Sequence, residues 1–142
     1  MNKASYYLVM AIGVLSVLSF FPHAFLGMKA VIEHIERGEI QEPAANGMQM
    51  IWFYSSIMML ISGLNLLILG DHILIGSHKA RLQVLILGLG LAVFGLGCTY
   101  ISGKIDAMSV FTFEGIVLIL ATTILYKKAH HLHDLDPFES GK

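Results

Sequence analysis

LQVLILGLGLAVFGLGCTYI, residues 82–101, contains no charged side chain. A helix of about 20 mainly apolar residues is long enough to cross the hydrocarbon core of a bilayer. In lipid, a helix also satisfies its own backbone polar groups, which an open strand cannot do. Three further stretches have the same character, so the sequence predicts four transmembrane helices, over about 5–27, 49–69, 82–101 and 108–126.

The composition agrees with a membrane protein. Hydrophobic residues make up 56% of the 142 residues and charged residues 13%, whereas soluble domains contain about 45–50% apolar and about 25% charged residues. We therefore expect one transmembrane domain over 1–142, with a polar tail at 127–142. The net charge of -1 argues against a basic nucleic-acid binder. Cys98 is the one cysteine, which excludes an internal disulfide.

The first helix is expected to be longer than its membrane-spanning part. Apolar and polar residues alternate at helical spacing after Gly27, which predicts one helix over 4–37, about 50 Å long, that extends beyond the bilayer and stops at Gly38. Pro22 lies inside it and predicts a kink, since proline cannot donate a backbone hydrogen bond.

Capping residues predict where the other helices begin and end. Asn46, with Gln49 three residues later, resembles a capping box at the start of the second helix. Ser77 and Asp106 are good N-caps for the third and fourth helices. Gly103 is expected to end the third.

Four crossings place both termini on one side of the membrane. That side carries six basic residues, Lys3, Lys79, Arg81, Lys127, Lys128 and Lys142, and the opposite side carries three, Lys29, Arg37 and Lys104. The positive-inside rule then predicts cytoplasmic termini, in a membrane that we expect to be a bacterial inner membrane.

Small residues predict how the helices associate, because lipid provides no hydrophobic drive for it. One stripe on the third helix recurs at spacings of four and three and consists of Gly88, Ala92, Gly95, Thr99 and Ser102. We expect an all-α, antiparallel up-down four-helix bundle. The stripe either packs helices of this chain alone or faces another subunit.

Two ionisable residues within the predicted spans, His23 and Glu114, are candidates for a functional site. The antiparallel order predicts that both lie near the outer surface. Other side chains expected at that level include Trp52, Tyr54, Ser55, Ser56 and Thr99. The alternative is an ordinary aromatic belt at the interface and a His–Glu pair that only lowers its own burial cost.

A weaker metal candidate lies after the fourth helix. His130, His133 and Asp134 fall within one turn of each other if the helix continues. A solvated tail that tolerates histidines is the alternative.

Three functions follow as hypotheses. The first is a non-catalytic accessory or scaffold subunit that binds a membrane protein or a second copy of itself through its helices. The second is a binder or transporter of a small molecule, lipid or ion at the His23 and Glu114 pocket, and the third is a lipid-modifying enzyme that uses the same residues. The residues point to no cofactor and identify no substrate.

Overall fold

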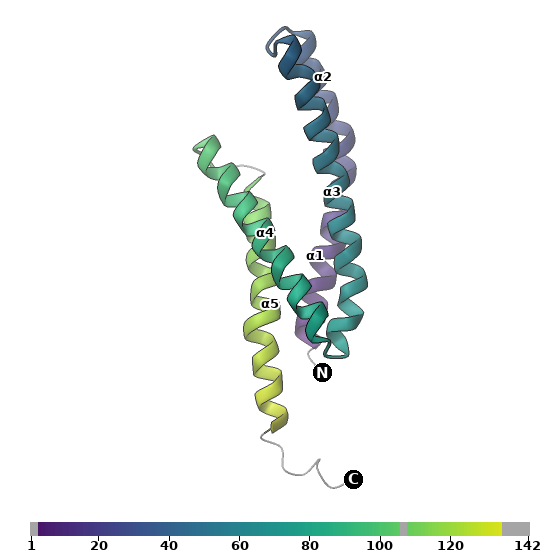
Figure 1. Cartoon of the computed structure of the whole chain (residues 1–142), viewed down its shortest axis with the longest axis vertical. Coiled ribbons are helices and arrows are strands. Elements are labelled where there is room, and N and C mark those ends of the chain that lie inside the picture. Colours follow the sequence, from purple (N-terminus) through teal and green to yellow (C-terminus); the bar gives the residue numbers. More distant parts are fainter. Residues whose placement is uncertain (1–2, 106–107, 135–142) are drawn as a thin grey trace. The chain divides into compact units, whose positions relative to one another are not determined.

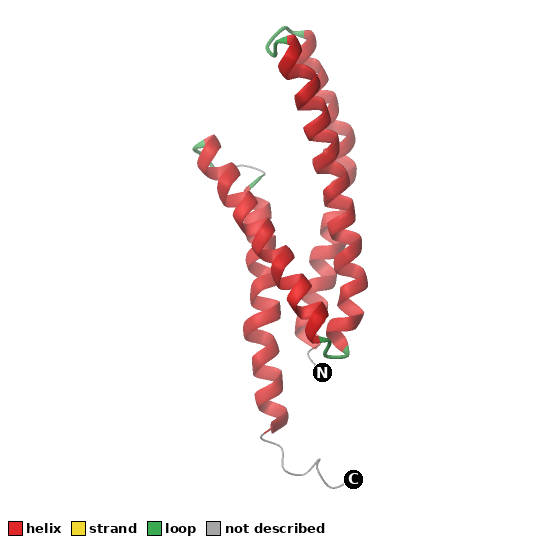
Figure 2. Ribbon diagram, in the orientation of Figure 1, coloured by secondary structure: helices red, strands yellow, loops and turns green. Residues whose placement is uncertain are grey.

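The computed structural model describes residues 3–105 and 108–134, without the side chains of 42–43 and 124–134. Every regular element in this part of the chain is helical (Figure 1). The elements are α1 (Lys3–Pro22), the π-helical turn η1 (His23–Gly27), α2 (Met28–Glu36), α3 (Glu42–Leu74), α4 (His78–Ser102) and α5 (Ser109–Asp134). Figure 2 shows the short turns that join them.

Three of the helical stretches have the length and the apolar composition needed to cross a membrane. They are Lys3–Glu36, Ala44–Leu74 and His78–Ser102, with 34, 31 and 25 residues. The portion of α5 with described side chains, Ser109–Thr123, is apolar but shorter. The helix itself continues through 26 residues to Asp134, so the first part of the predicted polar tail is helical.

Helix ends follow local backbone chemistry. The Ser77 hydroxyl accepts a hydrogen bond from Ala80 N–H at 3.3 Å and caps α4, as predicted. Gly38, with φ 70°, and Gly103, with φ 66°, follow the last turns of α2 and α4. A side chain at such a positive φ would be strained, so glycine is the residue that ends both helices at the predicted places.

The predicted capping box at Asn46 is wrong. Helix α3 begins at Glu42, and the carbonyl of Gln41 accepts the N–H groups of Ala44 and Ala45, each at 3.0 Å. Pro43 lies in this first turn. Backbone N–H groups there have no acceptor within the helix, so a residue without an N–H group costs no helical hydrogen bond. Helix α3 also continues to Leu74, past the predicted end of the second span.

The helix does not stop at Pro22. The backbone continues from α1 through a turn of π-helix, His23–Gly27, directly into α2, and the stretch Lys3–Glu36 forms one helical segment of about 50 Å. A π-helical turn is rare and widens the helix locally. The kink predicted at Pro22 stays a prediction, and what the structure has next to Pro22 is this π-helical turn, which begins at the next residue.

The chain divides into two compact units, 1–12 with 66–142, and 13–65. In the first unit, α4 and α5 run antiparallel in close contact. A Cβ atom added at Gly88 would lie 2.9 Å from Leu118 Cβ, and one added at Gly115 would overlap the backbone of Ala92. Only small residues allow two helix backbones to approach this closely.

The first unit has one apolar core. Its buried residues are Val9, Ile12, Leu66, Ile73, Ala80, Val84, Leu118 and Ala121, drawn from α1, α3, α4 and α5. Ser5 fixes the start of α1 against α5, since its buried hydroxyl donates to the carbonyl of Ala121 at 2.6 Å. The hydrogen bond from Ser5 to Ala121 joins residues that lie 116 positions apart in sequence.

In the second unit, α1 meets α3 through another pair of glycines. A Cβ atom at Gly63 would lie 2.8 Å from Val17 Cγ2 and 2.9 Å from the Gly13 carbonyl. Farther along the same pair, His23 contacts Ser56, and Gly27 lies against the ring of Trp52. The order of these contacts makes α1 and α3 antiparallel.

We expect Gly115→Ala and Gly90→Ala to change stability in opposite directions. The new methyl at Gly115 meets the backbone of α4, which cannot move aside, so the free energy of unfolding should fall by about 1–3 kcal/mol. At Gly90 a Cβ meets nothing within 4 Å, and the better helix propensity of alanine should add about 0.5–1 kcal/mol. Denaturant titration of both variants in one detergent measures this, and equal effects would contradict the α4–α5 contact.

Candidate functional site

The π-helical turn places His23 against α3. Its Nδ1 lies 2.8 Å from the hydroxyl of Ser56, and its ring stacks on that of Trp52 with the centroids 4.5 Å apart and the planes 5° from parallel. The imidazole is half-buried. Two neighbours on one helix therefore fix both the position and the tilt of this ring.

Trp52 is itself held by the turn. Its indole N–H donates to the backbone carbonyl of His23 at 2.9 Å, and the indole ring lies over the α-carbon of Gly27. Any side chain at residue 27 would overlap that ring. The π-helical turn after Pro22 therefore contacts Trp52 at two points, the carbonyl of His23 and the α-carbon of Gly27.

Ser56 is the serine of α3 that contacts His23, whereas the sequence placed Ser55 and Ser56 at the same level and gave only Ser55 as a candidate ligand-binding residue. Ser56 is 1% exposed, and its hydroxyl also donates to the carbonyl of Trp52 at 2.8 Å. The spacing of Ser56, Gly63 and Gly70 by seven residues is a signal that could have identified the face of α3 that contacts α1.

The other predicted pocket residues have their own local contacts. Ser55 donates to the carbonyl of Trp52 at 2.9 Å, while the Tyr54 side chain is 65% exposed. Thr99 lies in the other unit, where its hydroxyl donates to the carbonyl of Gly95 at 2.9 Å and lies 3.2 Å from the hydroxyl of Ser109. Its contacts therefore belong to the pairing of α4 with α5.

Glu114 also lies in the first unit, on α5. Its side chain is 3% exposed, and helical spacing puts it on the buried face that continues with Leu118 and Ala121. Within 3–105 and 108–123, we find no hydrogen bond or ion pair to its carboxyl group. An ionisable side chain in apolar surroundings is costly, which keeps Glu114 a candidate residue in its own right.

The predicted stripe of small residues on α4 divides between two environments. Gly88, Ala92 and Gly95 are buried, and a Cβ atom at Gly95 would overlap Thr112 on α5. Ser102 is exposed, and its hydroxyl donates to the carbonyl of Lys104 at 2.9 Å. The buried part of the stripe packs on α5.

No group of three potential metal ligands occurs among the described side chains. The predicted metal candidates His130, His133 and Asp134 lie on the helical backbone of α5, but their side chains are outside the described part.

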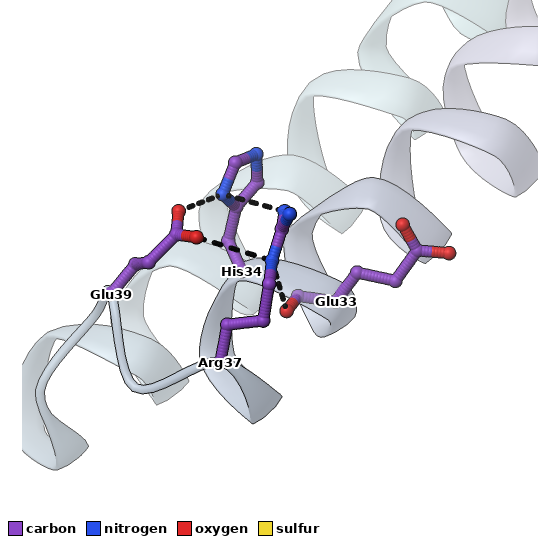
Figure 3. Close-up of polar contacts among 4 residues, drawn as sticks. All are labelled: Glu33, His34, Arg37 and Glu39. Carbon is purple, nitrogen blue, oxygen red and sulfur yellow. Dashed lines mark hydrogen bonds and ion pairs between the residues drawn. The ribbon is translucent and has the colours of Figure 1, made fainter.

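A second polar cluster closes the turn between α2 and α3 (Figure 3). Nδ1 of His34 donates to Oε2 of Glu39 at 2.5 Å, and Nε of Arg37 forms an ion pair with Oε1 of Glu39 at 3.1 Å. Arg37 also donates to the carbonyl of Glu33 at 3.2 Å. The hydrogen bond from His34 is the main reason that the pKa of Glu39 is lowered. Desolvation is the next effect and opposes it, and the charges of Arg37 and His34 also lower the pKa.

Comparison with known proteins adds no functional assignment, because no family model, curated protein or solved structure matches this chain.

Ser56→Ala should destabilise the protein more than Ser55→Ala does. Both hydroxyls donate to the carbonyl of Trp52, but only Ser56 also contacts His23. We expect Ser56→Ala to lower the free energy of unfolding by about 0.5–1.5 kcal/mol. It should also change the fluorescence of Trp52, the chain's one tryptophan. Equal losses and equal spectra in the two variants would contradict the His23–Ser56 bond.

Removing His34 should raise the pKa of Glu39 toward its ordinary value. A carboxylate with a lowered pKa stabilises the folded turn above its unfolded pKa, and this contribution is lost as the pH falls through the lowered value. An NMR titration of the Glu39 side chain in wild type and His34→Ala measures the two midpoints. Glu33→Gln is the control, because Arg37 contacts only the backbone of residue 33. Identical midpoints in wild type and His34→Ala would contradict the assigned cause.

Proposed function

We propose that this chain is a non-catalytic subunit of a membrane assembly, which binds another transmembrane helix through the exposed face of α4. Four crossings of a bacterial inner membrane, an antiparallel bundle and cytoplasmic termini are parts of this proposal. The lengths of the three apolar helices and the excess of basic residues on the side of the termini support it.

The observation that carries the proposal is a second set of glycines on α4. Gly90 and Gly97 are both exposed, and a Cβ atom at either would meet nothing within 4 Å. They lie on the opposite side of the helix from Gly88 and Gly95, which pack on α5. Helix α4 therefore has small residues on two faces, of which α5 covers one.

Branched apolar side chains flank these glycines at helical spacing. We call the set Ile86, Gly90, Val93, Gly97 and Ile101 the outer glycine face. Its three large side chains are 59%, 69% and 85% exposed. Glycines between branched side chains form the shallow groove into which another helix packs in a membrane, where close approach provides the attraction. A second copy of the chain is the partner that can be tested directly.

Gly97→Leu should weaken self-association by roughly 5-fold to 150-fold, since a leucine in the groove costs about 1–3 kcal/mol of packing. The variant should not lower the thermal stability of the monomer, because the site is open and leucine has a higher helix propensity than glycine. Native mass spectrometry across a range of protein-to-detergent ratios gives the dimer fraction, and thermal unfolding gives the stability.

Gly47→Leu is the matched control, since a Cβ at Gly47 also meets nothing within 4 Å but lies on α3. A wild-type protein that stays monomeric, or a Gly97→Leu variant that associates as the control does, would contradict binding through the outer glycine face.

A second candidate function is the binding of a small molecule, lipid or ion at His23. The network of His23, Trp52 and Ser56 favours it, because this network holds a half-buried imidazole in one orientation near the end of an apolar helix. Glu114 remains a candidate residue of the same function. Acid–base chemistry on a lipid would need these side chains as well, but the described geometry provides no argument for a reaction.

A further inference from the structure

We infer that His23 accepts a hydrogen bond from a lipid headgroup through its Nε2 atom. This inference rests on the second function proposed above, ligand binding at His23, and specifies the ligand as a headgroup that donates a hydrogen bond.

The network determines which nitrogen of His23 carries the proton. The Ser56 hydroxyl has a single proton, and it donates this proton to the carbonyl of Trp52 at 2.8 Å. With its proton placed there, Ser56 accepts from His23, 2.8 Å away, and we assign Nδ1 of the imidazole as the donor. In the neutral ring, Nε2 consequently holds the free lone pair.

That lone pair has no partner within the part of the chain that the structure describes. The ring cannot turn to find one, because stacking on Trp52 and the bond to Ser56 both fix it. A histidine that donates through one ring nitrogen to a fixed partner presents the lone pair of the other in a fixed direction, as metal-binding histidines do. The acceptor at Nε2 calls for a ligand with an N–H or O–H group.

The position of the site along the second unit favours a lipid headgroup over a ligand deep in the membrane. Lys29 lies six residues beyond His23, and Gln49 lies three residues before Trp52. At 1.5 Å per residue the site is about 5–9 Å from these first polar side chains. This distance matches the roughly 5–7 Å of interface on each side of a hydrocarbon core. Trp52 and Tyr54 are aromatic residues typical of that depth.

Stepwise methylation of a lipid headgroup tests the inference. The full-length protein is placed in dioleoyl phosphatidylcholine nanodiscs that contain a fixed minor fraction of phosphatidylethanolamine or of its N-methyl, N,N-dimethyl or N,N,N-trimethyl form. The ammonium keeps at least one N–H group until the last methyl is added, whereas headgroup size changes at every step. We expect the thermal midpoint to drop by roughly 2–4 °C at the last methylation alone. A gradual change, or none, would overturn the inference.

Two variants separate the ligand from the fold. In His23→Asn the amide can still donate to Ser56 but nothing replaces Nε2, so the drop should vanish while the protein remains folded. In His23→Gln the amide can place an oxygen near the position of Nε2, so part of the drop should return. An equal drop in wild type and His23→Asn would show that the lipid acts elsewhere and would overturn the assignment to His23.

A further measurement distinguishes the two levels of the proposal. ¹⁵N-histidine NMR of wild type, with His23→Asn to assign the signal, should show Nδ1 protonated and Nε2 unprotonated for the neutral ring. A protonated Nε2 overturns the acceptor role. If wild type instead gains stability from phosphatidylmethanol, a lipid whose headgroup has no N–H or O–H donor, while His23→Asn does not, a ligand binds at His23 but it is not a hydrogen-bond donor, which overturns the inference. If no lipid distinguishes the two proteins, ligand binding at His23 fails as well.

Discussion

Close contact between helix backbones is the constraint on which the rest of this structure depends. Gly88, Gly95 and Gly115 allow α4 and α5 to touch, and Gly13 and Gly63 do the same for α1 and α3. Lipid tails are as apolar as leucine, so burial alone does not hold such helices together. Stability must come from dispersion contacts at short range, and a single added methyl at a backbone contact removes them.

The same closeness shapes the polar chemistry of the chain. Because α1 and α3 approach each other at Gly13 and Gly63, side chains farther along the two helices are close enough to make contact. His23 contacts Ser56 and Trp52 in this way. The π-helical turn begins directly after Pro22 and offers the carbonyl of His23 to the indole N–H. A backbone irregularity is tolerated at this point because the neighbouring helix supplies a donor.

The structure distinguishes groups that are already in contact within the chain from groups that are open to a partner. Small residues covered by a helix of the same chain are explained by the fold, whereas Gly90 and Gly97 are open and are the basis for proposing a partner. The imidazole of His23 has a corresponding asymmetry, with one nitrogen committed to Ser56 and the other available. The two proposals share no residue, so each can fail without the other.

The sequence by itself determined the helical class, the approximate extent of the apolar helices and several of their ends, because hydropathy, capping serines and αL glycines act locally. It also singled out His23 and Trp52. Only the tertiary structure decided that Ser56, and not Ser55, contacts His23, since a shift of one residue turns a side chain by about 100° around the helix. It likewise decided which glycines of α4 meet α5 and which stay exposed. That choice depends on the register between two helices, which no local pattern fixes.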